Sequence, residues 1–291
     1  MKEFLQYTER LRPLTIQWAL SIGSAWHTAL EVLGQGADEE TAVQAGLATL
    51  DWIESTDPET TYKFELERAR TEVMIRQAIR RFLPRNMVMV EQEFEVPILN
   101  PRTGKKSRSF VLGGKADGVA EIDGQLWLIE NKTTGLSLDQ YREMYGLNNQ
   151  ISLYTYAVSR FIEKPLAGAI MRTIVKTRME PKKKGGEVVE DWDSYKARLM
   201  ETYDTEPERF IAEDAVYRTP EQLKDFEAEL WIESQERLWQ AKSGVIRHNT
   251  AACGDFGGCA FKAICLGVEG ARESLFRVSA TTHDELPSET G

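Results

Sequence analysis

The stretch from Gly113 to Gly135, GGKADGVAEIDGQLWLIENKTTG, most constrains how this chain can fold. It contains two apolar runs separated by Asp123-Gly124, and an Asp-Gly pair in that position is a strong signal for a β-hairpin. The second run, Leu126–Ile129, is continuously apolar, which is typical of a strand buried on both faces. We therefore predict a β-hairpin within the core of the fold.

Polar residues on this hairpin can form a metal site. Asp117 lies on the first strand, while Glu130 and Lys132 end the second, so the hairpin can bring all three side chains together. Two adjacent carboxylates repel each other unless a cation lies between them, and Mg²⁺ binds one or two carboxylates with water and phosphate. A nearby lysine can stabilise charge on a phosphate or orient a metal-bound water. The alternative is a surface salt bridge between Lys132 and Glu130.

Composition limits the function classes. With 291 residues, 42% of them apolar, the chain is long enough for one large domain with a sizeable core. It has no apolar run long enough to span a bilayer and no signal-peptide core near its start, so we expect a cytoplasmic protein. Its formal net charge of −10 argues against a protein that coats nucleic acid, yet it allows a nuclease with a locally basic channel.

The region before the hairpin is predicted to be helical. Helices are expected over Pro13–Leu33, Asp38–Ile53 and Pro58–Leu83, as an insertion or lid ahead of the sheet, and a strand over Asn86–Leu99. His27 lies in the first helix, where a single histidine is more often a core or surface residue than a metal ligand. The apolar residues that alternate along the strand are Val88, Val90, Phe94 and Val96.

The region after the hairpin is predicted to continue with a long helix over Ser137–Phe161. Gln150 and Tyr154 are four residues apart on it and therefore share one face. This amide and phenol can contact a base or phosphate near a metal site, or they can form part of a half-buried helix face. A further strand is expected over Leu166–Val175.

A basic window runs from Arg172 to Lys184, with six basic residues against one acidic residue. We interpret it as the only dense basic patch of the chain and as the place where a DNA backbone binds, with Arg172, Lys176 and Arg178 as candidate contacts. The alternative is a solvated, flexible loop that continues into Gly185-Gly186.

The cysteines lie close together near the C-terminus, at Cys253, Cys259 and Cys265, after a charged helix over Pro220–Ser243. Clustered cysteines in a reducing compartment favour a metal over disulfides. Zinc and iron–sulfur clusters need four ligands, so His248 completes a zinc site or a residue outside this chain completes a cluster. The alternative is three buried free thiols. The polar segment after Glu269 is predicted to be disordered.

Taken together, these motifs resemble the RecB-family nucleases of the PD-(D/E)xK superfamily, over roughly residues 7 to 265. The cysteine segment resembles a subgroup that carries a [4Fe–4S] cluster, which includes AddB-type, CRISPR-adaptation-type and phage nucleases. The matching residues, in chain order, are His27, Asp117, Glu130-Asn131-Lys132, and Gln150 with Tyr154.

The resemblance implies an α/β fold with a central mixed sheet flanked by helices, an N-terminal helical insertion and a C-terminal Cys-rich clasp. The expected parts are a helical region over 1–85, a nuclease core over 86–218, a helix with the clasp over 219–268, and a disordered tail over 269–291.

The resemblance also implies roles for individual residues. His27, Asp117 and Glu130, with the main-chain carbonyl of Asn131, would bind Mg²⁺ or Mn²⁺, and the histidine suits Mn²⁺. Lys132 would be the catalytic lysine. The residues that would hold DNA near the scissile phosphate are Gln150 and Tyr154.

The implied function is a metal-dependent DNA exonuclease that acts on single strands or duplex ends in recombination, repair or phage DNA processing. The setting would be a bacterial or phage-infected cell, with a helicase or recombination protein as partner. The alternatives are a structure-dependent or CRISPR-adaptation-type endonuclease, and a catalytically silent DNA-end-binding partner of a helicase. In this family the first cluster cysteine usually precedes the His helix. We therefore expect that the chain start is truncated and the [4Fe–4S] ligand set incomplete, or that the cluster was lost.

Overall fold

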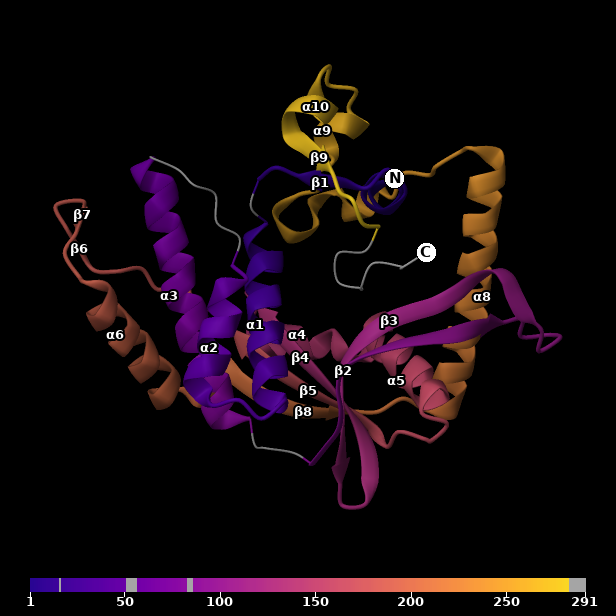
Figure 1. Ribbon diagram of the computed structural model, residues 1–291, viewed down its shortest axis with the longest axis horizontal. Coiled ribbons are helices and arrows are strands. Elements are labelled where there is room, and N and C mark those ends of the chain that lie inside the picture. The colour runs from indigo at the N-terminus through magenta and orange to yellow at the C-terminus, as the bar shows by residue number, and fades with distance from the viewer. Residues whose placement is uncertain (16, 51–56, 83–85, 283–291) are drawn as a thin grey trace. The chain divides into compact units, whose positions relative to one another are not determined.

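The computed structural model describes residues 1–15, 17–50, 57–82 and 86–282 (Figure 1). The chain divides into two compact units. One unit comprises Met1–Gln17, Pro97–Val111 and Ala228–Gly291, and the other comprises Trp18–Val96 and Leu112–Glu227.

The larger unit is built on a five-stranded sheet, with strand order β2, β3, β4, β5, β8. β3 is antiparallel to β4, β4 is parallel to β5, and β5 is antiparallel to β8. The predicted α/β fold with a central mixed sheet flanked by helices is therefore confirmed. The strand bounds are β2 Asn86–Leu99, β3 Lys106–Ile122, β4 Gln125–Thr134, β5 Gly168–Val175 and β8 Ile211–Val216.

The predicted central hairpin is formed by β3 and β4. Ile122 pairs with Gln125 across the Asp123-Gly124 turn. Both turn residues have positive φ angles, 51° and 75°, as the hairpin turn that favours Asp-Gly requires. Leu128 and Ile129 are buried, in agreement with the continuous apolar run. The local sequence therefore determines this part of the fold.

Helices of the larger unit pack around one hydrophobic cluster. Asp38 and Asp57 cap α2 and α3 by accepting hydrogen bonds from main-chain N–H groups, which explains where these helices begin. The cluster is centred on buried aromatic residues that include Trp26, Tyr195 and Tyr203. The helix bounds are α1 Trp18–Gly34, α2 Glu39–Ala48, α3 Pro58–Arg81, α4 Leu138–Glu143, α5 Asn149–Phe161, α6 Trp192–Thr205 and α7 Pro207–Phe210.

The long helix predicted over Ser137–Phe161 is wrong, because the structure forms α4, a short 3-10 turn and α5 instead. Ser137 begins α4 with a capping box to Gln140. The side chain of Asn148 then accepts a hydrogen bond from the main-chain N–H of Gln150, at 2.8 Å, and so begins a second helix. A side-chain cap in the middle of an apolar periodicity thus divides the predicted helix in two.

The smaller unit joins the two ends of the described chain. β1 (Leu11–Pro13) pairs with β9 (Phe276–Val278). Phe276 stacks on Phe261, with ring centroids 5.0 Å apart, next to buried Leu5. The other elements of this unit are the π-helix Phe4–Thr8, the 3-10 helix Thr250–Gly257, α9 Lys262–Cys265 and α10 Ala271–Leu275.

The C-terminal segment differs from its prediction as a disordered tail over 269–291. Residues 271–278 form α10 and β9, because β9 is completed by a strand from the other end of the chain. Residues 283–291 lie outside the described part. α8 (Pro220–Ser243) is the charged helix predicted over these residues, and no described helix has the length and apolar character needed to cross a membrane.

Candidate metal centre and active site

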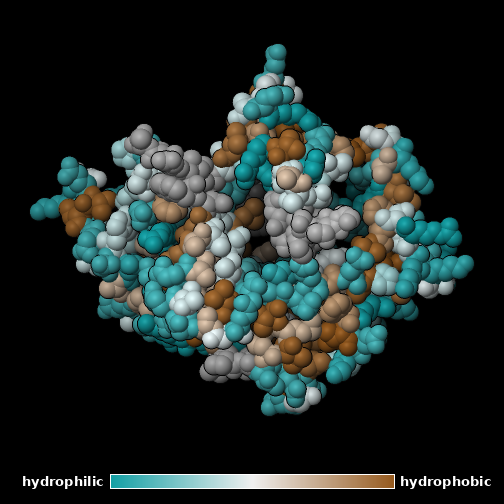
Figure 2. All heavy atoms as spheres, viewed as in Figure 1, coloured by the Kyte–Doolittle hydropathy of each residue, from teal (hydrophilic) through white to brown (hydrophobic). Residues whose placement is uncertain are grey.

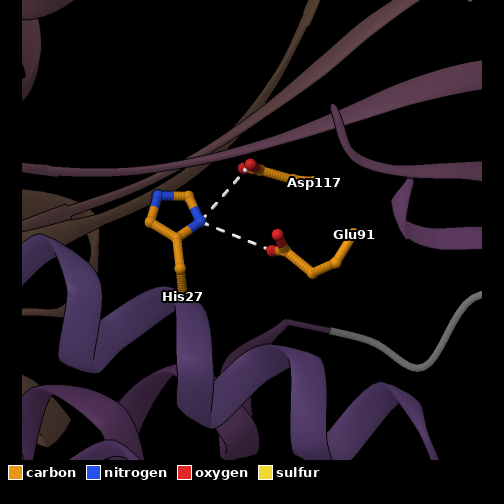
Figure 3. Close-up of side chains that lie close together, drawn as sticks. All are labelled: His27, Glu91 and Asp117. Carbon is orange, nitrogen blue, oxygen red and sulfur yellow. Dashed lines mark ion pairs between the residues drawn. The ribbon is translucent and has the colours of Figure 1, made fainter. Parts of the chain in front are cut away.

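Three residues from different elements converge on one point in the larger unit (Figure 3). The Nδ1 atom of His27, on α1, lies 3.3 Å from Oδ1 of Asp117, on β3, and 3.7 Å from Oε1 of Glu91, on β2. Among the described residues, these form the one group of three or more potential ligands whose atoms all lie within 4.8 Å of one another. His27 is therefore part of a cluster with carboxylates rather than an isolated helical histidine.

Asp117 and the end of β4 are held together by the hairpin register. Gly118 pairs with Ile129, so the next pair along the ladder sets Asp117 beside Glu130. The main-chain N–H of Asn131 donates a 2.6 Å hydrogen bond to Oδ2 of Asp117. This bond orients the carboxylate and leaves Oδ1 facing His27. Besides burial, Asp117 also contributes to raising the pKa of Glu130, so the two carboxylates lie close enough to repel each other.

Lys132 forms an ion pair with Glu130, but this pair is not on the surface. Glu130 is only 1% exposed. Burial, together with Asp117, raises the pKa of Glu130 to about 7. Burial also opposes the charge of Lys132, yet Glu130 and Asp117 raise the pKa of this lysine above its ordinary value. The salt bridge exists, therefore, but inside a crowded and buried group of charges.

The donor set fits a hard divalent cation. Oε2 of Glu130 is buried and has no hydrogen-bond partner among the described residues. Buried polar atoms are nearly always paired, so such atoms at a carboxylate cluster indicate a missing partner of positive charge. Carboxylate oxygens with one imidazole nitrogen suit Mg²⁺ or Mn²⁺.

Glu91 is the site residue that the sequence reasoning missed. Its Oε2 lies 3.0 Å from Nζ of Lys115, which in turn lies 3.7 Å from a carboxylate oxygen of Glu31. Burial disfavours the charge of Glu91, but hydrogen bonds from His27 and Lys115 hold its pKa below the ordinary value. Glu91 therefore links the histidine of α1 to a cation of β3.

The backbone of β2 explains why Glu91 points inward. Glu91 has a φ of +46°, which is unusual for a residue with a side chain. Phe94 and Val96 of the apolar alternation are buried, whereas Val88 is 53% exposed. In β2 the less exposed residues have odd numbers before Glu91 (Met87 and Met89), and the buried residues have even numbers after it (Phe94 and Val96). A one-residue bulge shifts the alternation of a strand in this way. A positive φ at a glutamate leaves no signal in the residue pattern.

Comparison with known protein families agrees with this arrangement. A model of the PD-(D/E)XK nuclease superfamily matches residues 3–266. The chain belongs to this superfamily. The match identifies no subgroup within it, and no curated protein matches the chain.

Gln150 and Tyr154 of this nuclease lie on one face of α5, as their spacing predicts. The Nε2 atom of Gln150 lies 3.5 Å from the hydroxyl of Tyr154, and the Tyr154 ring contacts Phe94 edge-on. Burial, and then the charge of Glu130, raises the pKa of Tyr154, so the phenol lies near the carboxylates. Tyr141, on α4, has its pKa raised by burial and also lies near Lys132 and Glu130. No sequence motif had marked Tyr141.

The three residues predicted to contact the DNA backbone, Arg172, Lys176 and Arg178, differ in their burial and in the groups that they contact. Arg172 donates a 3.0 Å hydrogen bond to Glu213 and lies over the Phe82 ring, with 11% of its side chain exposed. Lys176 follows the end of β5, and burial lowers its pKa. Arg178 is exposed and its guanidinium lies 3.4 Å from the carbonyl of Gly135, beyond the end of β4. The rest of the window forms a small hairpin from β6 (Lys183–Lys184) and β7 (Glu187–Val188).

The cysteines do not form the expected ligand cluster. All three are free thiols; Cys253 and Cys265 are exposed and Cys259 is partly exposed. In the part of the chain that the structure describes, they do not come within ligand distance of one another as a group, with or without His248. The main-chain N–H of Cys259 donates to the carbonyl of Cys253, so the segment is closed by its backbone. Neither the Cys-rich clasp nor three buried thiols describes this segment.

Proposed function

We propose that this PD-(D/E)XK nuclease is a divalent-metal-dependent DNA exonuclease that acts on DNA ends in recombination, repair or phage DNA processing. The observation that supports it most is the group formed by Asp117, the buried Glu130 and Lys132, with His27 lying 3.3 Å from Asp117. Such a group brings potential metal ligands and the lysine ammonium close together, and hydrolysis of a phosphodiester uses both kinds of group.

The metal ion would be held by His27 and Asp117, whose ligand atoms lie within 4.8 Å of Glu91, with Glu130 and the main-chain carbonyl of Asn131 as further ligands. When bound, it would supply Lewis-acid activation of water and neutralise charge on the phosphate. Asp117 is oriented for this role by the hydrogen bond from the main chain of Asn131. The ion pair with Glu130 keeps the ammonium of Lys132 at the carboxylates, where it can stabilise negative charge that develops on a phosphate.

DNA would be positioned by the residues around the carboxylates. The amide of Gln150 and the phenol of Tyr154 lie together on α5 and can donate hydrogen bonds to a phosphate. Lys176, which directly follows β5, adds positive charge, and so does Arg178, whose guanidinium lies near Gly135 just after β4. Arg172 contributes less to this proposal, because Glu213 and Phe82 already engage its guanidinium.

The test is digestion of end-labelled linear DNA and closed circles with Mg²⁺ or Mn²⁺. We expect linear DNA to be degraded and circles to survive, whereas cleavage of circles would favour a structure-dependent or CRISPR-adaptation-type endonuclease. Binding of ends without cleavage would favour a non-catalytic partner of a helicase; the intact Asp117, Glu130 and Lys132 speak against that alternative.

Lys132→Ala connects the activity to the site. We expect this variant to lose cleavage by about a hundredfold to a thousandfold, as is typical for loss of an electrostatic stabiliser. Lys164→Ala is the matched control, since Lys164 is an exposed lysine after α5 and outside the site. Retained cleavage by Lys132→Ala, with far-ultraviolet circular dichroism unchanged, would contradict the assignment. Iron and zinc analysis of the purified protein tests the separate question of a metal at the cysteines.

A further inference from the structure

The turn between β2 and β3 carries a second concentration of positive charge, which the sequence reasoning overlooked. It belongs to the segment Pro97–Val111 of the smaller unit. In Figure 1, β2 and β3 run out together to a narrow tip at the end of this hairpin. The segment contains Arg102, Lys105, Lys106 and Arg108 and no acidic residue, although the whole chain has a net charge of −10.

The backbone of this tip is well ordered by its own hydrogen bonds. The main-chain N–H of Asn100 donates to the carbonyl of Lys105 at 2.8 Å, and the N–H of Gly104 donates back to the carbonyl of Asn100, also at 2.8 Å. The side chain of Asn100 accepts from the N–H of Arg102 at 2.9 Å. Gly104 has a φ of +68°, the left-handed conformation that glycine adopts without strain. The tip therefore presents its side chains from a preformed turn.

The four cations of the tip are available for a ligand. Arg102, Lys105, Lys106 and Arg108 are all exposed, and none forms an ion pair within the described residues. Cations elsewhere in the chain, such as Arg70, Arg76 and Arg198, are bound to carboxylates. Figure 2 shows the tip as a hydrophilic projection. An acidic protein that gathers unneutralised cations at a projecting turn has a surface suited to a polyanion.

We propose that the β2–β3 tip binds the phosphate backbone of duplex DNA. Four cations can displace the counterions of several phosphates, which is the main source of affinity for DNA. Proteins that hold single strands use aromatic side chains on which bases stack, whereas the one aromatic residue of the segment Pro97–Val111 is the half-buried Phe110. A two-stranded β-ribbon also has the width to enter the major groove of B-DNA. The inference deepens the proposed function, on which it rests, by naming duplex DNA as the substrate that is held.

The proposal is tested by replacing the four cations together with glutamine, as Arg102→Gln, Lys105→Gln, Lys106→Gln and Arg108→Gln. Binding of the full chain to a fluorescent duplex is measured by anisotropy in EDTA, so that no cleavage occurs, at several NaCl concentrations. We expect binding to weaken at least about tenfold and the slope of log K against log[salt] to fall by about 2 to 4. The matched control removes four other exposed lysines, at Lys164, Lys224, Lys242 and Lys262.

Each outcome separates this inference from the proposed nuclease activity. An equal loss in the control variant would show that net charge alone matters and would overturn the inference. An equal loss for single strands would overturn the assignment to duplex DNA. Unchanged duplex binding, with lost binding to phosphatidylserine vesicles, would make the tip a lipid site instead.

Cleavage of a short nitrophenyl phosphodiester reports on the metal centre independently. We expect the tip variant to retain it, whereas its absence in the unmodified protein would contradict the nuclease proposal and leave the binding result standing.

Discussion

Replacement of Glu91 by glutamine tests whether this residue positions His27, the histidine proposed as a metal ligand. Oε1 of Glu91 lies 3.7 Å from Nδ1 of His27, and Oε2 lies 3.0 Å from Lys115. Glu91→Gln keeps the shape of the side chain and removes its charge, so the imidazole loses one of the two carboxylates that orient it. Loss of such an orienting partner typically weakens metal binding by about 10- to 100-fold. We therefore expect Mn²⁺ to bind at least about tenfold more weakly to Glu91→Gln.

The loss of Mn²⁺ affinity can be measured from the free energy of unfolding as well as from direct binding. A ligand at 1,000 times its dissociation constant stabilises the native state by about 4.1 kcal/mol, and at 100 times by about 2.7 kcal/mol. A tenfold loss of affinity therefore removes about 1.4 kcal/mol of the stabilisation that Mn²⁺ provides. The assay is denaturant unfolding with and without Mn²⁺, together with direct titration followed by electron paramagnetic resonance of the free ion. Neither measurement depends on DNA cleavage.

Two control variants separate the charge of Glu91 from its backbone conformation. Glu95→Gln removes a carboxylate from an exposed position of the same strand, and we expect no change in Mn²⁺ affinity. Glu91→Gly also removes the carboxylate, but it relieves the left-handed φ of +46°, a strain of about 1 to 2 kcal/mol. We expect Glu91→Gly to bind Mn²⁺ as weakly as Glu91→Gln and to be more stable without metal. A Glu91→Gln variant with unchanged Mn²⁺ affinity would refute the positioning role.

Two further predictions concern the packing that supports the site, and both are measured by urea unfolding. We expect Gly46→Ala to destabilise the protein by about 1 to 3 kcal/mol. The added Cβ would lie 2.5 Å from the carbonyl oxygen of Ala25 and 2.9 Å from the side chain of Ala29, both on α1. This steric clash outweighs the better helix propensity of alanine. Unchanged or increased stability would show that α1 and α2 can separate freely. We expect Tyr203→Phe to lose about 1 to 2 kcal/mol, because the buried hydroxyl donates a 2.7 Å hydrogen bond to the carbonyl of Val175 at the end of β5. A loss below about 0.3 kcal/mol would contradict that account.

The sequence predicts the part of the site that rests on neighbouring residues. The Asp123-Gly124 turn sets the register of β3 and β4, and that register alone sets Asp117 beside Glu130. Lys132 shares a face with Glu130 because strand side chains alternate, and their ion pair follows. Local chemistry is sufficient here, since each relation spans only the hairpin.

The remainder depends on contacts or backbone conformations that no local pattern records. Glu91 reaches His27 because one residue of β2 adopts a positive φ, which shifts the parity of the strand. β9 forms because Phe276 meets Leu11–Pro13, which lie at the other end of the chain. The predicted cysteine clasp relied on spacing alone, and spacing does not determine whether three thiols come within ligand distance of one another.

The burial of the charged group distinguishes the two interpretations that the sequence left open at Glu130 and Lys132. A surface salt bridge contributes little stability and costs little, so its presence says nothing of function. Glu130 is 1% exposed, and a carboxylate and an ammonium removed from water cost several kcal/mol each, which their attraction often fails to recover. Apolar residues of similar size at these positions would give an equal or greater stability. Asp117 increases the cost further, because it brings a second negative charge to the same point. This arrangement of charges does not stabilise the fold. It does provide carboxylate ligands for a divalent cation and a positive charge for a phosphate. The burial of this salt bridge therefore supports the proposed catalytic role of Lys132 over a purely structural role at the strand end.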